Sequence, residues 1–305
     1  MRVVSLLASA TEIVCALGRR ELLVGRSHEC DYPAEVRALP RCSDPSFAVE
    51  GTSAEIDRAV RAAARDALSI YRVDEHRLRE LKPDLILTQT QCEVCAVSLE
   101  DVERVLSAEL RRDCKVLAVA PQRFEDVRED ILRIGAALGA GDEARALTSQ
   151  MKSRLGGLSA RVRLLPRRSA AVLEWLDPLM GAGHWIPELL EAAGGRDALG
   201  AQPGRKGAWL TFEQLRDADP DVLIAAPCGF PISRTRPEFE ALLARPEWRA
   251  LRAVREGRVF VADGNEYFSR PGPRLVETAE MLAEMLHPAE VSLGHENRGY
   301  RRLIL

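Results

Sequence analysis

The chain has 305 residues and a formal net charge of −3, with 46% apolar and 29% charged residues. This length exceeds one ordinary hydrophobic core, so two lobes are expected. The composition is that of a soluble globular protein. The slightly acidic charge excludes nucleic acid as the main partner, since phosphate binding needs a basic surface. No apolar run approaches the roughly 20 residues of a membrane-spanning helix.

The first residues, MRVVSLLASATEIV, lack the basic stretch, the apolar stretch and the small-residue cleavage site of a secretory signal. They predict a first β-strand that starts almost at Met1. We therefore expect a cytoplasmic protein if Met1 is the native start. If a longer native N-terminus has been trimmed, we expect a periplasmic or cell-surface protein.

Seven short runs rich in β-branched residues and leucine predict β-strands, each followed by a loop and a helical pattern. The runs are apolar throughout rather than alternating, which is typical of parallel sheets covered by helices on both faces. The predicted strands are Val3–Leu7, Leu22–Arg26, Asp84–Gln89, Lys115–Ala120, Ala170–Trp175, Asp221–Ala226 and Arg258–Ala262.

A long helical stretch separates two groups of strands. Apolar residues recur with a helical period over Phe124–Leu138, Gly139 and Gly141 interrupt the pattern, and a second helix is predicted from Asp142 to about residue 164. We therefore expect an α/β protein of two lobes, each with a mainly parallel sheet flanked by helices, joined by a long rigid helix. The expected divisions are an N-terminal lobe at 1–140, a connecting helix at 141–165, a C-terminal lobe at 166–288 and a peripheral tail at 289–305.

Cysteine and histidine concentrate in the loops that follow the predicted strands. Ligands bind outside the carboxyl ends of the strands in open parallel sheets, and His and Cys are preferred ligands of zinc and related metals. Cys92 and Cys95 form a Cys-x-x-Cys pair that could supply two ligands to one metal ion. His28 and Cys30, in the neighbouring loop, could supply the other two. The candidate metal ligands are His28, Cys30, Cys92, Cys95, His184 and Cys228.

Two other interpretations of the cysteines stay open. Cys92 and Cys95 could be a redox pair activated at a helix N-terminus, or two unrelated buried thiols. The odd total of seven cysteines favours reduced thiols over a disulfide framework.

Polar and aromatic residues near the strand ends form a second set of candidates. A hydroxyl at Ser9 or Thr11 can cap the following helix, whose free N–H groups could meet an anionic group. Aromatic residues are only 5% of the chain, yet several lie in or beside loops of the second lobe, where rings could wall a flat apolar ligand. The ligand-binding candidates from this pattern are Ser9, Thr11, Trp185, Trp209, Phe230 and Tyr267.

The chain resembles the class III solute-binding proteins, which deliver vitamin B12, haem and siderophores to ABC importers, and it is most similar to the cobalamin-binding branch. The resemblance covers about Val3 to Leu286. It is carried by Ser9-Ala10-Thr11-Glu12, Leu23-Val24-Gly25-Arg26, Cys30-Asp31-Tyr32-Pro33, Leu81-Lys82-Pro83-Asp84-Leu85-Ile86-Leu87, Glu188-Leu189-Leu190 with Ala193-Gly194-Gly195, Thr211-Phe212-Glu213-Gln214-Leu215 and Asp219-Pro220-Asp221-Val222-Leu223-Ile224.

The resemblance implies two lobes bridged by a long helix, a ligand held between them, and one surface glutamate per lobe that docks on arginines of the transporter. Glu213 matches the second-lobe glutamate. The first-lobe position holds His76, so we take the adjacent Glu75 as the candidate. Where B12 binders often place aromatic residues on first-lobe loops, this chain has Glu29 and Gln89, which we add to the ligand-binding candidates as part of a polar wall.

The function expected from the sequence is non-catalytic binding of a cobalamin-like or other metal-chelate ligand in the inter-lobe cleft, with an ABC transporter permease as partner. The ligand or cofactor would be cobalamin, another metal tetrapyrrole or chelate, or a zinc or iron ion. An alternative is a cytosolic metal-ion or thiol-redox protein, such as a chelatase-like enzyme, and a third is a structural zinc protein. No Gly-rich phosphate loop or serine nucleophile elbow points to another enzyme class.

Overall fold

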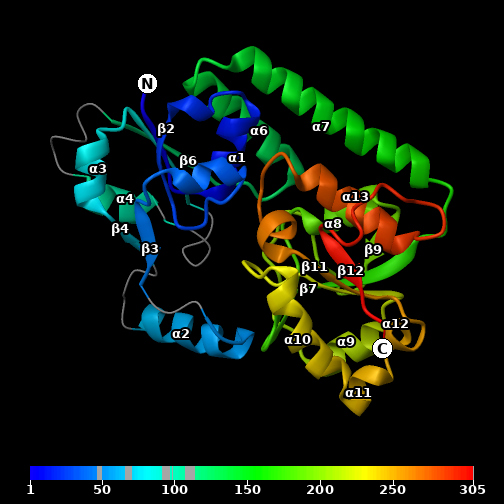
Figure 1. The fold of residues 1–305 in the computed structure, drawn as a ribbon. Helices are drawn as coiled ribbons and strands as arrows, with labels where there is room; N and C mark the ends of the chain where they lie inside the picture. Colours follow the sequence, from blue (N-terminus) through cyan, green and yellow to red (C-terminus); the bar gives the residue numbers. More distant parts are fainter. Residues whose placement is uncertain (47–49, 66–70, 91–96, 98, 107–113, 305) are drawn as a thin grey trace. The chain divides into compact units, whose positions relative to one another are not determined.

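The computed structural model describes residues 1–46, 50–65, 71–90, 97, 99–106 and 114–304. The chain divides into two compact units (Figure 1). The first comprises Met1–Gly51, Glu55–Pro121 and Glu125–Gln150, and the second comprises Thr52–Ala54, Gln122–Phe124 and Met151–Leu305. Each unit contains a main β-sheet with helices around it, which confirms the α/β class.

The sheet of the N-terminal unit has four parallel strands in the order β2-β1-β5-β6. Val4 of β1 pairs with Ile86 of β5, and both side chains are fully buried, as expected for a parallel sheet covered by helices. All four strands match predicted runs. Their bounds are β1 Val3–Ser5, β2 Leu23–Arg26, β5 Leu85–Gln89 and β6 Lys115–Val119.

Helices and a small two-stranded sheet surround these strands. Leu78 and Val102, from two of the helices, are fully buried in one apolar cluster with Val4 and Ile86. The strands β3 Ser43–Pro45 and β4 Tyr71–Val73, which the sequence did not predict, pair antiparallel. The helices of this half of the chain are α1 Ala8–Ala16, α2 Ser53–Arg65, α3 Glu75–Leu81, α4 Leu99–Val105 and α6 Phe124–Ala137, with short turns η1 Arg20–Leu22 and η2 Ala34–Ala38.

The C-terminal unit has a six-stranded sheet with the path β12-β11-β10-β7-β8, and β9 also pairs with β7. The strands β7, β9, β10 and β11 run parallel, whereas β8 and β12 are antiparallel to their neighbours. The bounds are β7 Arg168–Leu176, β8 Leu179–Gly181, β9 Gly195–Asp197, β10 Val222–Ala225, β11 Val259–Ala262 and β12 Tyr300–Arg302.

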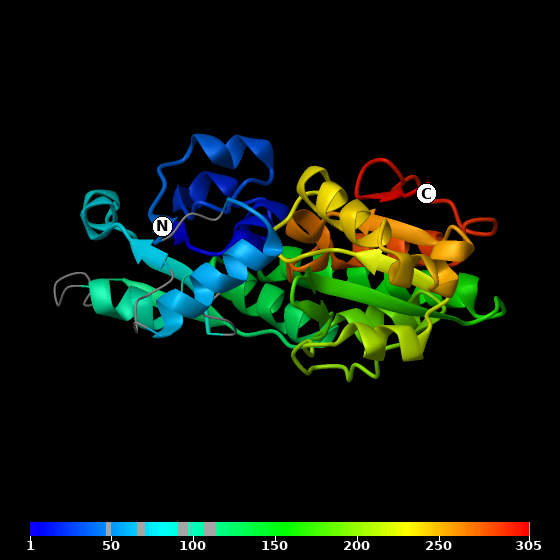
Figure 2. The same ribbon diagram turned by 90° about the horizontal axis from the view of Figure 1, so that it is seen from below.

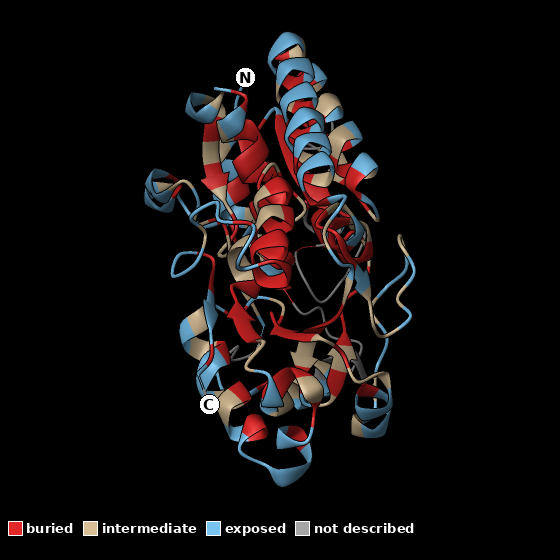
Figure 3. Cartoon of the chain, turned by 90° about the vertical axis from the view of Figure 1, so that its right-hand side faces the viewer, coloured by how far each residue is buried: buried red, intermediate tan, exposed pale blue. Residues whose placement is uncertain are grey.

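Both faces of this sheet are covered by helices. On one face Leu223 and Val261 lie in a buried cluster with Phe239 of α10 and Trp248 of α11. Figure 1 shows α8 and α13 on the opposite face. Every residue of β1, β5, β10 and β11 is buried, and buried residues run through the sheets in Figure 3. The helices are α8 Ile186–Ala192, α9 Phe212–Ala218, α10 Ile232–Leu243, α11 Pro246–Arg249, α12 Arg252–Arg255 and α13 Leu275–Leu286, with η3 at Gly264–Phe268.

The helix α7, Gly141–Val162, follows α6 directly. Gly139 has a φ of +66°, the left-handed conformation that glycine adopts without strain, and it ends α6 as predicted. With 22 residues α7 is about 33 Å long, and its residues belong to both compact units. In the described ranges no helix is both long and apolar enough to cross a bilayer.

The end of the chain corrects the expectation of a peripheral tail. Tyr300 of β12 pairs with Ala262 of β11, and Figures 1 and 2 show this last strand beside β11. Tyr300 and Leu303 are only 4% and 3% exposed. The segment was missed because Tyr-Arg-Arg contains no apolar run, and its place is set by pairing with a distant strand.

Candidate functional site

The candidate residues lie where strands end. In each unit the parallel strands bring their carboxyl ends to one edge of the sheet. In the N-terminal unit this edge leads into α1 and into the Ser27–Cys30 loop. In the C-terminal unit it leads into the loop before α10 and into η3.

The Cys30 thiol is enclosed by hydrogen-bonding groups of three neighbouring elements. Its Sγ atom lies 2.9 Å from the Thr11 hydroxyl, 3.2 Å from the Ser27 hydroxyl and 3.6 Å from the Ser5 carbonyl oxygen. Cys30 and Thr11 are fully buried, and Ser9 is 2% exposed. The Cys30 thiol therefore links β1, the loop after β2 and α1, and all three predicted site residues are closed to solvent in this conformation.

His28 lies beside this group and is also largely buried. Its Nδ1 atom lies 3.4 Å from the Ser43 hydroxyl, its ring centroid 5.2 Å from that of Tyr71, and its Nε2 atom 3.9 Å from the Glu29 carboxylate. Burial, with Arg41 nearby, lowers the pKa of His28 to about 4. The imidazole is therefore neutral at pH 7, the form that can accept a hydrogen bond or coordinate a metal.

The remaining polar candidates of this unit differ in exposure. Gln89, the last residue of β5, is 3% exposed, whereas the Glu29 side chain is 34% exposed. The Glu29 backbone N–H donates to the Ser27 hydroxyl, which fixes the loop. Tyr32, 46% exposed in the same loop, was not predicted as a site residue. The sequence signal that could have identified it is an aromatic residue just after a strand-end loop.

Trp209 is the most exposed aromatic side chain in the described part of the C-terminal unit, at 54%. Its backbone is held against β8: Gly181 donates its N–H to the Ala208 carbonyl at 2.9 Å, and Leu210 donates to Leu179 at 2.8 Å. A fixed ladder thus presents a large apolar ring to solvent, an arrangement that soluble proteins use for binding.

Trp185 and Phe230 are buried, at 5% and 2% exposure. The Trp185 indole N–H donates to the Phe268 carbonyl at 2.9 Å. The Phe230 ring lies 5.2 Å from that of Trp175, with the Arg234 guanidinium 3.8 Å above it. In this conformation both rings support the loops from within and do not form an open wall.

His184 and Cys228 complete the predicted metal set of the C-terminal unit. His184 has a φ of +53°, and its buried Nδ1 atom has no hydrogen-bond partner among the described residues. Burial, together with Lys206, lowers the pKa of His184. The half-buried Cys228 donates its backbone N–H to the Glu174 carbonyl at 3.1 Å.

The metal site predicted from sequence is not assembled by the described residues. Across the parts of the chain that the structure describes, no three His, Cys, Asp or Glu side chains gather closely enough to hold a metal ion. Cys92 and Cys95 lie outside those residues. The thiolate-based part of the hypothesis therefore stays a prediction.

A compact ionic group surrounds η3 at the end of β11. The buried Arg274 donates to Glu266 at 3.1 Å, and its guanidinium lies 4.8 Å from the centre of the Tyr267 ring. The buried Arg270 donates to the Asn265 side-chain oxygen at 3.2 Å. The sequence predicts Tyr267 as a site residue but not the two arginines. The feature that could have identified them is the basic stretch Ser-Arg-Pro-Gly-Pro-Arg after a strand-end loop. The π-helical turn, often found at functional sites, presents Glu266 and Tyr267 half-exposed.

The two proposed docking glutamates occupy similar positions in their own units. Glu213 is exposed in the first turn of α9, which begins with a capping box of Thr211 and Gln214. Hydrogen bonding to its own backbone N–H and to Thr211 lowers the pKa of Glu213. Glu75 lies in the first turn of α3 and pairs with Arg79 one turn later.

Comparisons with known proteins agree with this architecture. Residues 3–266 match the family model for periplasmic binding protein. The chain is 26% identical over 296 residues to YvrC, an uncharacterized ABC transporter substrate-binding lipoprotein of Bacillus subtilis (strain 168), covering 94% of this chain and 80% of the relative. It is 22% identical over 293 residues to a vitamin B12-binding protein of Photorhabdus laumondii, covering 94% and 88%.

A solved periplasmic haem-binding protein from Pseudomonas aeruginosa has the same fold, with a TM-score of 0.70 at 20% identity, covering 96% of this chain and 95% of that one. The family match spans most of the chain, and the two α/β units with their parallel sheets are consistent with it. This chain belongs to the periplasmic binding protein family of ABC importers.

Proposed function

We propose that this protein is a non-catalytic binding protein for a metal chelate of the tetrapyrrole class, such as cobalamin or haem. The ligand would contact loops that follow the strands. The relatives named above include proteins for vitamin B12 and for haem, both large flat metal complexes. The proposal depends on residues of this chain that could hold such a molecule.

Trp209 is the observation on which the proposal chiefly rests. Its ring is 54% exposed while its backbone is fixed to β8 through the flanking residues. An ordered aromatic side chain of this kind loses little conformational entropy when a flat ligand covers it. We therefore assign the stacking surface of the C-terminal unit to Trp209.

The η3 loop supplies the polar contacts on the same unit. Glu266 and Tyr267 are half-exposed, and Arg274 fixes both from the buried side. A small number of precisely placed polar groups is typical of small-molecule sites, where these groups set the orientation of the ligand. We propose that Glu266 and Tyr267 hydrogen-bond the polar edge of the chelate.

In the N-terminal unit the accessible candidates are Glu29 and Tyr32. His28 lies next to Glu29, with its Nε2 atom 3.9 Å from the Glu29 carboxylate. The neutral imidazole of His28 is 12% exposed. Axial coordination of the chelated metal by a histidine would need this neutral form. We propose Glu29 and Tyr32 as ligand contacts and His28 as the candidate axial ligand of this unit.

The partner would be the membrane permease of an ABC importer, and docking would use exposed glutamates. Glu213 and Glu75 each lie in the first turn of a helix in a separate unit. Carboxylates at such positions would form charge-assisted pairs with arginines of a permease. The role of each glutamate is part of this proposal.

The test replaces Trp209 and measures chelate binding by titration. Trp209→Ala should weaken binding of haemin or cyanocobalamin by about thirtyfold, since a buried aromatic anchor contributes about 2 kcal/mol. Trp209→Phe keeps a ring and should retain most of the affinity. Thermal unfolding of both variants should match the parent, because the side chain is exposed. Equal affinity of Trp209→Ala and the parent for a bound chelate would remove the stacking role.

A further inference from the structure

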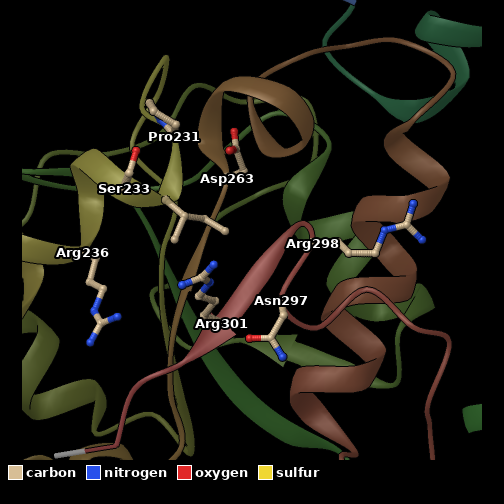
Figure 4. A pocket seen from close by; sticks show the side chains of 8 residues that line it. Pro231, Ser233, Arg236, Asp263, Asn297, Arg298 and Arg301 are labelled. Carbon is tan, nitrogen blue, oxygen red and sulfur yellow. The ribbon is translucent and has the colours of Figure 1, made fainter. Parts of the chain in front are cut away.

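A cavity lies in the C-terminal unit between α10 and the edge strand β12, next to the start of η3. The cavity has a volume of about 360 Å³. Its lining comes from the start of α10, the end of β11 and the segment leading into β12 (Figure 4). The lining residues are Pro231, Ile232, Ser233, Arg236, Asp263, Asn297, Arg298 and Arg301.

The sheet register explains why Arg301 reaches this cavity. Arg301 on β12 is paired with Val261 on β11, and directly opposite residues share one face of a sheet. Val261 is buried in the cluster that contains Phe239 of α10. The Arg301 side chain is therefore on the α10 face, and Figure 4 shows it directed from β12 toward the start of α10. Its neighbour Arg302 takes the opposite face and donates to the Gly257 carbonyl at 2.7 Å.

The charges around the cavity do not balance. Three arginines are among its lining residues, Arg236, Arg298 and Arg301, against the single acidic residue Asp263. Among the residues that the structure describes, neither Arg298 nor Arg301 has an ion pair or a side-chain hydrogen bond. Arg236 is paired through Nε with Glu240, at 2.7 Å on the same helix. Figure 4 shows Arg298 extending away from Arg301, so Arg301 is the central cation.

Asp263 does not neutralise this excess by pairing with Arg301. Its carboxylate accepts the backbone N–H of Glu266 at 2.7 Å, so it serves as the N-cap of η3. The first turn of α10 contains no acidic residue and no side-chain cap, and Ser233 adds a hydroxyl at the cavity wall. The helix end therefore adds to the positive potential that the arginines set.

We propose that this cavity binds a small organic anion bearing carboxylate or phosphate groups, with Arg301 as the principal charge partner and Ser233 and Arg236 as additional donors. Guanidinium groups bind carboxylate and phosphate through paired N–H donors. The cavity has room for a molecule with several such groups. The same chemistry could come from a free polyanion or from an anionic arm of a bound chelate.

Calorimetric titration with citrate and with inorganic phosphate tests the site on the full chain. Citrate should bind the parent protein, and Arg301→Gln should weaken it by about tenfold or more, the loss expected for a charge-assisted hydrogen bond. Arg302→Gln changes the next residue on the opposite face and should leave citrate binding within about twofold. Absence of citrate and phosphate binding at millimolar concentration, or equal losses in the two variants, would overturn the proposal.

Haemin titrations distinguish the two sources of the anion. If the cavity holds a carboxylate arm of the chelate, Arg301→Gln should weaken haemin binding as well, and citrate should compete with haemin. If it holds a free anion, citrate binding is lost in Arg301→Gln while haemin affinity is unchanged. Failure of haemin to bind at all would count against the proposed function and leave the citrate result to decide this site.

Discussion

The carboxylate of Glu284, on α13, accepts the backbone N–H of Gly294 at 2.8 Å. The same carboxylate accepts the N–H groups of Leu293 and His295, and Glu284 is only 4% exposed. A buried carboxylate with three backbone donors forms strong hydrogen bonds that fix a loop. This contact holds the segment before β12 against α13.

Replacing Glu284 should release the end of the chain. Glu284→Ala removes the charged acceptor of three backbone N–H groups and should lower the free energy of unfolding by about 3 kcal/mol. Urea denaturation measures this loss, and amide hydrogen exchange should accelerate most over residues 293–302. The exposed Glu290 offers a control, since Glu290→Ala should change stability by less than about 0.5 kcal/mol. Similar effects of the two changes would contradict the assigned contact.

His28 should make stability depend on pH on the acid side. Burial lowers its pKa from 6.5 to about 4 in the folded protein, so the unfolded chain takes up this proton first as the pH falls. Above pH 6.5 the neutral imidazole makes its full contribution to the free energy of unfolding. This contribution, roughly 3 kcal/mol at most, is lost as the pH falls from 6.5 to about 4. Unfolding free energies of the parent and of His28→Gln at pH 7 and pH 4.5 should show a smaller decrease in the variant. An equal decrease would mean that His28 does not cause the dependence.

The capping box at α9 should contribute measurably to stability. The Thr211 hydroxyl accepts the Gln214 N–H at 3.3 Å, and the Gln214 side chain accepts the Thr211 N–H at 2.8 Å. Thr211→Ala should lower the free energy of unfolding by about 1 kcal/mol, measured by urea denaturation. Thr211→Ser keeps the acceptor and should retain most of that stability. A loss in the serine variant as large as in the alanine variant would argue against the cap.

Charge reversal at Glu213 should separate docking from ligand binding. Glu213→Lys should reduce chelate uptake in cells that carry the matching permease, because the proposed pair with a permease arginine becomes repulsive. Chelate affinity of the isolated protein should not change. Asp217→Lys, an exposed acidic position on the same helix, is the matched control and should leave uptake near the parent level. Unchanged uptake in Glu213→Lys would exclude its docking role.

The parallel strands β1, β2, β5, β6, β7, β10 and β11 followed from sequence because strands covered by helices are rich in apolar residues, as in Val222–Ala225 and Val259–Ala262. The short strands β8 and β9 were not predicted. The run Tyr300–Arg302 could not be recognised as a strand, since a polar triplet becomes one only through pairing with β11 and anchoring by Glu284. A local sequence pattern predicts elements that are stabilised by neighbouring residues or by burial of their own apolar side chains. It misses elements whose position depends on residues far away in the sequence.

The candidate site could be predicted from the sequence even less completely than the strands. Trp209 was selected as one of several loop aromatics, and its exposure sets it apart from the buried Trp185 and Phe230. Cys30 has the residue type and spacing of a metal ligand, yet its thiol is enclosed by Thr11 and Ser27. Residue type gives the chemistry that a side chain can perform, whereas its neighbours in the fold decide whether a ligand can reach it.

Direct titration of the purified parent protein with haemin and cyanocobalamin, followed by absorbance and by tryptophan fluorescence, tests the binding function most directly. We expect saturable binding of at least one of these chelates, with a dissociation constant in the micromolar range or below. The accompanying quenching of tryptophan fluorescence should be lost in Trp209→Ala. No saturable binding of either chelate at tens of micromolar would contradict the proposed function.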